Sequence, residues 1–186
     1  MSEQVILSSH WTVECVRAGA LVWLAEYDNL VVTAGRNKIL DAVFKSGLAT
    51  PTWYVGLVDG ASTPTFAAAD TMSSHAGWTS NTAFSQTVRP TFVPGTVSAG
   101  ALDNSASKAS FTMNAGATIA GCFLVDSDTK TGTTGTLYAV GTFTGGSQAV
   151  VSLDVLNVTV SLTVTAAAAS TGFMPIKEEV FGVYHP

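Results

Sequence analysis

The chain has 186 residues, 47% of them hydrophobic, so a single domain can bury a sizeable core without disulfides or metals. Only 11% of the residues are charged, and 8 Lys and Arg within a net charge of −5 argue against nucleic acid as a partner, because phosphate binding depends on cationic side chains. The start lacks the basic segment of a signal peptide and the apolar stretch 18–25 is too short to span a bilayer, so we expect synthesis in a cytoplasm and no membrane partner.

The first 29 residues predict two neighbouring strands, which form an N-terminal unit or arm. Between residues 10 and 17, apolar side chains alternate with polar ones, and a second strand follows at 20–26. Gly19 lies between the two segments and suits a tight turn, so the pair is expected to form a hairpin or adjacent strands.

One helix is expected, near residues 34–46. Apolar side chains recur there on one helical face, at Ile39, Leu40, Val43 and Phe44. Thr33 can cap the start of this helix, Lys45 suits its last turn, and Gly47 can end it.

The remaining strand signals lie in a body spanning residues 30–165. Strands are predicted at 30–32, 52–58, 88–93, 108–114, 118–126, 136–144 and 149–165, the last being long enough for two strands joined near 153–156. Pro90 assigns its strand to a sheet edge. Between them, residues 59–85 show no clear period and predict a long surface connection with one helical turn near 68–74.

About eight or nine short strands with one early helix predict a mainly β, single-domain fold. We expect a two-sheet β-sandwich with jelly-roll or Greek-key wiring. Residues 166–186 follow as a C-terminal arm or a closing strand, and both interpretations stay open. This tail is dense in apolar side chains, at Phe173, Met174, Ile176, Val180, Phe181, Val183 and Tyr184.

No catalytic, cofactor or metal site is predicted. The three histidines lie outside any recognisable catalytic motif, and residues 35–38 lack the spacing of a phosphate-binding loop. Cys15 and Cys122 stand alone, so we expect buried free thiols. Residues 126–132 lack the closing acid of an EF-hand calcium loop.

The loop that carries Asp70, His75 and Trp78 has two interpretations. One is a metal or sugar site beneath the indole ring. The other, which we favour, is a loop anchored by hydrogen bonds and by packing of Trp78.

Several phrases of the sequence closely resemble a group of small proteins encoded by tailed phages and prophages. They are residues 37–40 (NKIL), 53–57 (WYVGL), 70–79 (DTMSSHAGWT), 89–90 (RP), 103–109 (DNSASKA) and 132–138 (GTTGTLY). The resemblance covers roughly residues 30–165. It implies a virion structural protein, placed as a head decoration or cement protein with a jelly-roll-like fold on the outer capsid surface.

The resemblance also implies a partner, the phage major capsid protein, whose neighbouring subunits the chain would clamp. Low charge and an apolar tail predict a homo-oligomer, either dimer or trimer. Candidate interface residues are Trp78, Phe173, Met174, Ile176, Phe181 and Tyr184. The alternative is a tail-associated or fibre-tip module that binds a host surface glycan; a polysaccharide hydrolase is disfavoured because the 13 acids are scattered singly.

Overall fold

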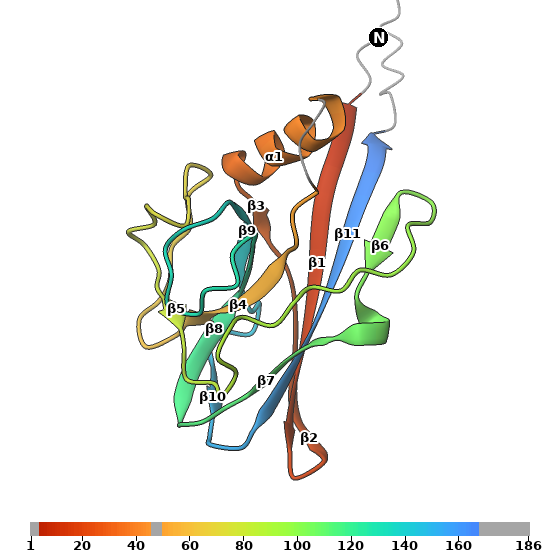
Figure 1. The fold of residues 1–186 in the computed structure, drawn as a ribbon. Coiled ribbons are helices and arrows are strands. Elements are labelled where there is room, and N and C mark those ends of the chain that lie inside the picture. The colour runs from red at the N-terminus through yellow and green to blue at the C-terminus, as the bar shows by residue number, and fades with distance from the viewer. Residues whose placement is uncertain (1–3, 46–49, 168–186) are drawn as a thin grey trace, which may run out of the picture.

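The computed structural model describes residues 4–45 and 50–167. Two antiparallel sheets face each other, and one α-helix lies across one end of them (Figure 1). This arrangement confirms the predicted mainly β, two-sheet sandwich.

Sheet A joins the N-terminal strands to the C-terminal one. Its strand order is β2 (Ala20–Asp28), β1 (Gln4–Arg17), β11 (Val155–Ala167) and β6 (Ala101–Asp103), and β7 (Ala109–Thr112) also pairs with β11. The first and last strands pair from Gln4 opposite Ala167 to Val16 opposite Val155. Because β1 has a neighbour on both sides, the N-terminal strands belong to the sandwich itself and do not form a separate arm.

Sheet B contains the other strands. Its order is β3 (Leu30–Val31), β9 (Leu137–Thr142), β8 (Ala117–Val125), β4 (Tyr54–Asp59) and β5 (Ser80–Asn81), with β10 (Gln148–Val150) also paired to β8. A 3-10 turn, η1 (Ser105–Ser107), lies between β6 and β7. The described strands change sheet after β2, β5, β7 and β10, so the wiring is not up-and-down.

The main core lies between the two sheets and follows the predicted alternation. In β1, Trp11, Val13 and Cys15 are fully buried, and the intervening side chains face the other way. In β11, Leu156, Val158 and Val160 do the same. A period of two therefore places one face of each strand in the core.

A second apolar cluster covers the outer face of sheet B, on the side away from sheet A. Its buried members are Val32, Val58, Met72, Trp78, Ala120, Phe123, Val125, Leu137 and Val140. Met72 and Trp78 come from residues 59–85, predicted as a surface connection. That prediction is wrong for this part of the segment, which packs on the sheet as a covering layer and contributes β5 to its edge.

The predicted β1–β2 hairpin is confirmed. Its turn has Ala18 at φ 49° and Gly19 at φ 83°, and Arg17 pairs with Ala20. Two consecutive positive φ values are typical of a type I′ turn, whose twist matches that of the flanking strands. An equivalent turn, with Ala99 at φ 49° and Gly100 at φ 76°, precedes β6.

Helix α1 spans Thr33–Phe44, close to the predicted bounds. The predicted Thr33 cap is wrong: the cap position is Val32, and the Thr33 hydroxyl accepts a hydrogen bond from Arg36. Gly47 lies outside the described residues. The helix docks through its early turns, where Gly35 is buried against the backbone of Tyr138.

The apolar face predicted for α1 is largely uncovered. Only Ile39 packs against the main core, whereas Leu40, Val43 and Phe44 are 55%, 67% and 79% exposed. The physical reason is that the helix packs on β9 through Gly35 in its first half, and the described part of the chain leaves its last turns uncovered. The predicted edge strand at 88–93 also fails to form, since it makes single bridges only, at Val88 and Thr91.

Candidate functional site

An apolar groove lies at the end of the sandwich beneath α1. It has a volume of about 280 Å³, and its lining includes Leu7, Ile39, Trp53, Leu102, Leu162 and Val164. In Figure 1 the upper parts of β1 and β11 rise to the level of α1, beyond the strands of sheet B. The inner face of sheet A therefore continues past the layer that covers it elsewhere.

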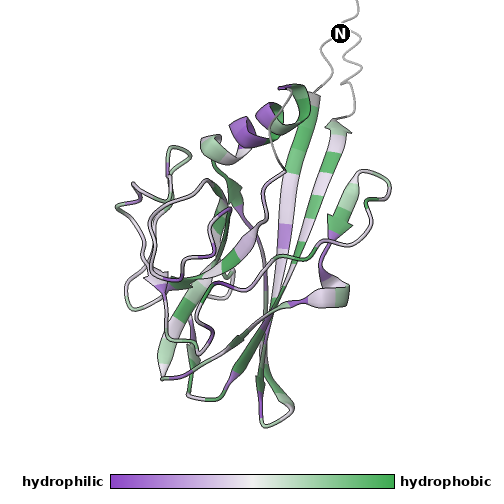
Figure 2. Ribbon diagram, in the orientation of Figure 1, coloured by the Kyte–Doolittle hydropathy of each residue, from purple (hydrophilic) through white to green (hydrophobic). Residues whose placement is uncertain are grey.

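The groove arises from the same alternation that builds the core. Leu7 of β1 and Val164 of β11 are paired in register and point to the same side as the fully buried Trp11 and Val160. Val164 is nevertheless 49% exposed. Figure 2 shows the hydrophobic bands of β11 continuing to the top of the strand. Apolar side chains thus face solvent where the opposing sheet ends.

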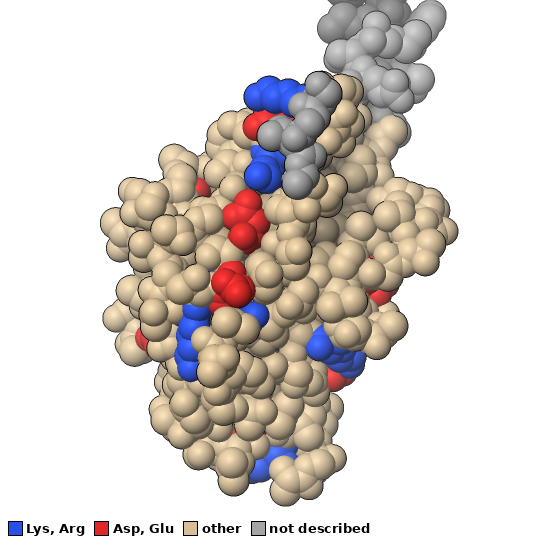
Figure 3. Space-filling model, viewed as in Figure 1, with Lys and Arg blue, Asp and Glu red and all other residues tan. Residues whose placement is uncertain are grey.

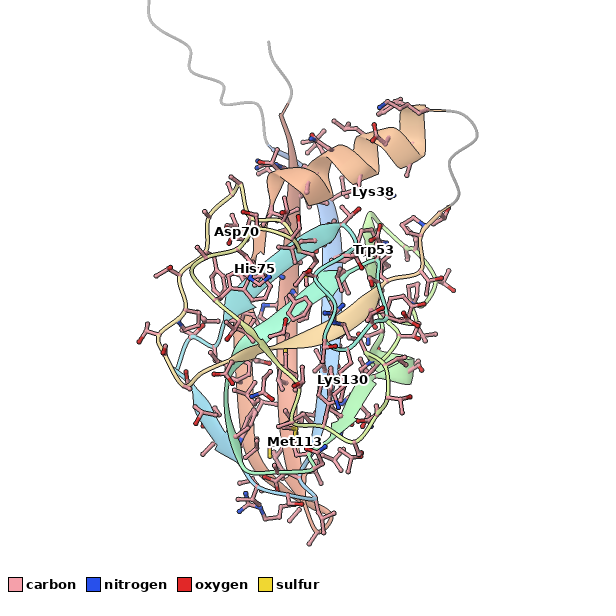
Figure 4. The ribbon with its side chains drawn as sticks, turned by 60° about the vertical axis from the view of Figure 1, so that its left-hand side comes forward. Lys38, Trp53, Asp70, His75, Met113 and Lys130 are labelled. Atoms are coloured by element: carbon pink, nitrogen blue, oxygen red, sulfur yellow. The ribbon has the colours of Figure 1, made fainter. Side chains whose placement is uncertain are left out.

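The floor of the groove is aromatic. The rings of Trp53 and Tyr138 meet edge to face with centroids 5.5 Å apart. Tyr138 is 4% exposed, and burial raises the pKa of its hydroxyl to about 12, so the ring stays neutral. Figure 4 shows Trp53 below α1. Such a surface suits an apolar or aromatic occupant.

Two neighbouring elements extend this apolar surface. Val43 lies one helical turn beyond Ile39 on the same face of α1. On the opposite rim, the turn before β6 contributes Val97, which is 64% exposed. A Cβ atom on Gly100 would lie 2.6 Å from the carbonyl oxygen of Val164, so only a residue without a side chain fits between this rim and β11.

A second uncovered apolar surface lies at the other end of the molecule, on the tip of the β1–β2 hairpin (Figure 1). Leu21, Val22 and Leu24 are 61%, 45% and 50% exposed on β2, an edge strand of sheet A. The pairing with β1 shifts register here, and Val22 has no partner across the strand pair. A bulge of this kind weakens the edge as a template for adding another strand.

Charged side chains are sparse over the visible surface. Figure 3 shows most of them in one column of both signs that runs down from α1, on a face that is otherwise largely uncharged. Within the described residues, the ion pairs on the outside include Glu14 with Lys108, Lys38 with Asp126 and Lys45 with Asp41, at 2.8, 3.6 and 2.5 Å, and His10 lies 2.9 Å from Asp28. The surface therefore offers little charge for recognising a charged ligand.

Trp78 is held inside its own loop layer. Its ring is 4% exposed, stacks on His75 with centroids 4.0 Å apart, and lies 5.2 Å from the Phe123 ring. Its indole N–H donates to Asp70 at 3.1 Å, and His75 Nδ1 lies 3.0 Å from the Trp78 carbonyl oxygen. This is the anchored loop that we favoured (Figure 4).

The burial of Trp78 corrects its assignment as a partner-interface residue, because its own chain covers the ring that a partner would contact. The other candidates, Phe173, Met174, Ile176, Phe181 and Tyr184, lie outside the described residues.

Arg89 is a buried cation that no pattern in the sequence singled out. It is 1% exposed, and its guanidinium donates to the carbonyl oxygens of Ser127 and Gly132 at 3.0 and 2.8 Å. Desolvation lowers its pKa from the usual value, although nearby Asp128 opposes this. Arg89 therefore fastens the loop once considered for calcium. Its dipeptide with Pro90 was visible only as a phrase of the family resemblance.

Asp154 is also a buried charge, with an exposed fraction of 0%. Both of its carboxylate oxygens accept hydrogen bonds from Arg17, at 2.7 and 2.8 Å, and the backbone N–H of Val151 donates to one of them. These bonds, with that of Arg17 first, lower the pKa of Asp154 to about 2. The interaction fixes the turn through which the chain passes from β10 to β11.

The two cysteines are free and buried, as expected. Burial, with a contribution from Asp154, raises the pKa of Cys15 to about 11, and burial raises that of Cys122 to about 12. Neither thiol is ionised at neutral pH, so neither is activated as a nucleophile. Within residues 4–45 and 50–167, no three His, Cys, Asp or Glu side chains form a group that could hold a metal ion.

No helix in the described ranges is both long and apolar enough to cross a bilayer. Comparison of the chain with protein-family models, curated proteins and solved structures found no match in any of the three.

Proposed function

We propose that the chain is a non-enzymatic structural protein of a tailed phage, which decorates the outer surface of the head and stabilises contacts between major capsid protein subunits. The observation that carries the proposal is the uncovered apolar surface at the tip of the β1–β2 hairpin, at Leu21, Val22 and Leu24, on a sandwich with few charges. Exposed patches of this kind mark contacts with other proteins.

The resemblance to small phage and prophage proteins supports the same conclusion. The sequence segments that carry the resemblance coincide with parts of the chain that stabilise the fold. Residues 70–79 cover sheet B, and Arg89 holds the neighbouring loop by hydrogen bonds. None of these phrases contains a cluster that resembles a catalytic site. Shared sequence in these places therefore fits a shared scaffold.

A cement role also suits the energetics of the surface. A decorating protein binds at many equivalent positions on a symmetric shell, so each copy needs only modest affinity. Uncharged polar faces allow close packing of neighbouring copies without repulsion. We include self-association, as a dimer or trimer, in the proposal.

The alternative, glycan binding at a fibre tip, calls for an exposed aromatic face beside polar groups. Trp78, the residue on which this alternative rested, does not offer such a face. Capsid decoration is therefore the better supported of the two.

The test is the copy number and position of the chain in purified virions, by quantitative mass spectrometry followed by cryo-microscopy. We expect hundreds of copies on the outside of the head. A handful of copies at the tail would overturn the proposal in favour of the alternative, and complete absence from virions would reject both.

A further inference from the structure

We propose that the apolar groove beneath α1 is the docking site for residues 173–184 of the same chain. The inference does not rest on the proposed function, since it concerns how the molecule completes its own surface. The groove belongs to the described part of the chain, and its lining is almost entirely apolar.

The groove is built like an unfinished core. Leu7, Leu162 and Val164 continue the inward-facing rows of β1 and β11, but at this height none of the described strands of sheet B opposes them (Figure 1). The Trp53 and Tyr138 rings form the floor. Each apolar side chain left in water here forgoes the free energy that burial would supply, about 25 cal/mol per Å². A segment that covers the groove would recover it.

The chain leaves the described structure beside this groove. Strand β11 ends at Ala167, three residues after Val164, which lines the groove. The next residues, 168–172, include Ser170, Thr171 and Gly172, which suit a turn. Five residues reach up to about 17 Å when extended, more than the roughly 10 Å between the layers of a sandwich. Residue 173 can therefore reach the groove.

The composition of residues 173–184 matches the groove. Apolar and aromatic side chains make up most of the segment, at Phe173, Met174, Ile176, Val180, Phe181, Val183 and Tyr184. Its charges, Lys177, Glu178 and Glu179, sum to −1. The cations of helix α1 above the groove already have partners, because Lys38 pairs with Asp126 and Lys45 pairs with Asp41. The match therefore rests on the apolar ends of the segment, which find a complement in the apolar lining of the groove.

Tethering favours the segment of the same chain over that of a neighbour. A short connection gives the segment an effective concentration in the millimolar range at the groove, far above micromolar protein in solution. With about 1 mM effective concentration and a Kd near 0.1 mM, the groove would be covered about 90% of the time.

Thiol protection tests the inference. Cys15 and Cys122 are buried, so a cysteine introduced by Val164→Cys is the reactive thiol in the folded protein. We expect a water-soluble maleimide to label this variant about tenfold more slowly in the full chain than in a chain that ends at residue 169, as 90% coverage requires. The matched control is Leu21→Cys at the far hairpin, whose labelling rate should be the same in both chains.

A double substitution in the full chain tests the inference without truncation. Phe173→Asp together with Phe181→Asp, in the full chain with Val164→Cys, should restore fast labelling. A synthetic peptide of residues 168–186 added to the shortened chain should slow it again.

Equal labelling of Val164→Cys in the full and shortened chains would overturn the inference. Protection that grows with protein concentration would also overturn it, because the segment would then come from a neighbouring copy.

Discussion

The outer faces of the two sheets differ although the sheets share one core. In sheet B, strand β8 has seven consecutive buried residues, from Ile119 to Val125, because loops and the start of α1 cover its outer side. In sheet A, the outward residues of β11, such as Asn157, Thr159 and Ser161, are half-exposed. A continuous apolar run thus marks a strand covered twice, and strict alternation marks a strand covered once.

Polar groups hold the extra layer on sheet B in place. Asp70 accepts hydrogen bonds from the indole of Trp78 and from the backbone of Ala67, and Arg89 binds two carbonyl oxygens of the loop beyond β8. Sheet A has no equivalent layer within the described residues. We therefore expect mutations on the two outer faces to differ sharply in cost.

The largest effect is expected at Phe123, which is fully buried in the outer layer of sheet B, over Gly56 and against Trp78. Phe123→Ala should lower the free energy of unfolding by about 4 kcal/mol, through lost burial and the cavity left behind. Urea unfolding measures this. On sheet A, Thr159→Ala should cost less than about 0.5 kcal/mol. Similar losses at the two positions would remove the distinction between the faces.

The next effect concerns the turn that links the sheets. Asp154→Ala leaves Arg17 and the Val151 N–H without their acceptor and should cost about 3 kcal/mol. The exposed pair of Glu14 and Lys108 on the outer face of sheet A is the control, and Glu14→Gln should cost about 0.5 kcal/mol or less.

The same carboxylate predicts a pH dependence. Its folded pKa of about 2 lies below the unfolded value of 3.8, so its stabilisation is complete above the unfolded value and is lost as the pH falls through about 2. The stability difference between the native chain and the Asp154→Ala variant should shrink between about pH 4 and pH 2. A constant difference over this range would show that the charge of Asp154 contributes nothing.

A smaller loss is expected for Arg89→Lys. The guanidinium of Arg89 donates hydrogen bonds to both Ser127 and Gly132, and an ammonium group cannot reproduce this geometry. The substitution also removes the contact with the Phe123 ring, whose centroid lies 5.2 Å from the guanidinium carbon. Thermal unfolding should show a loss of about 2 kcal/mol. Lys108→Arg on sheet A should leave the midpoint unchanged, and a shift as large as that of the Arg89 variant would contradict the assignment.

The smallest effect is a gain. Leu153 has a φ of 73° and is 76% exposed in the turn from β10 to β11. The left-handed backbone is unfavourable for Leu, and burial of the side chain does not offset this cost. Leu153→Asn should raise stability by about 0.5 kcal/mol, because Asn tolerates this conformation. Val151→Asn, in the same turn at an ordinary φ, should give no gain in the same denaturation assay.

Periodic segments were the predictable part of the fold. The alternation at residues 10–17 and the turn at Gly19 predicted the β1–β2 hairpin, and the long segment 149–165 does divide into β10 and β11. The break falls at Val151–Asp154, slightly earlier than expected. These features are local, so the sequence contains them directly.

The covering layer and the groove were not predictable in the same way. Met72 and Trp78 follow no period, since a loop that packs on a sheet needs only a few anchors at irregular spacing. The pattern of Leu7 and Val164 is indistinguishable from that of the buried Trp11 and Val160. Whether such a residue lies in the core or in an open groove depends on how far the opposite sheet extends, which is a tertiary property.

The pairing of β1 with β11 has a consequence for synthesis on the ribosome. Strand β1 emerges early, yet its partner follows about 140 residues later, on the order of ten seconds at ordinary rates of translation. Until then, Trp11 and Val13 belong to a hairpin that lacks its neighbour β11. Sheet A can close only after β11 has been made, so incomplete chains are the species most prone to aggregate, and refolding should be slow because its defining contacts are distant in sequence.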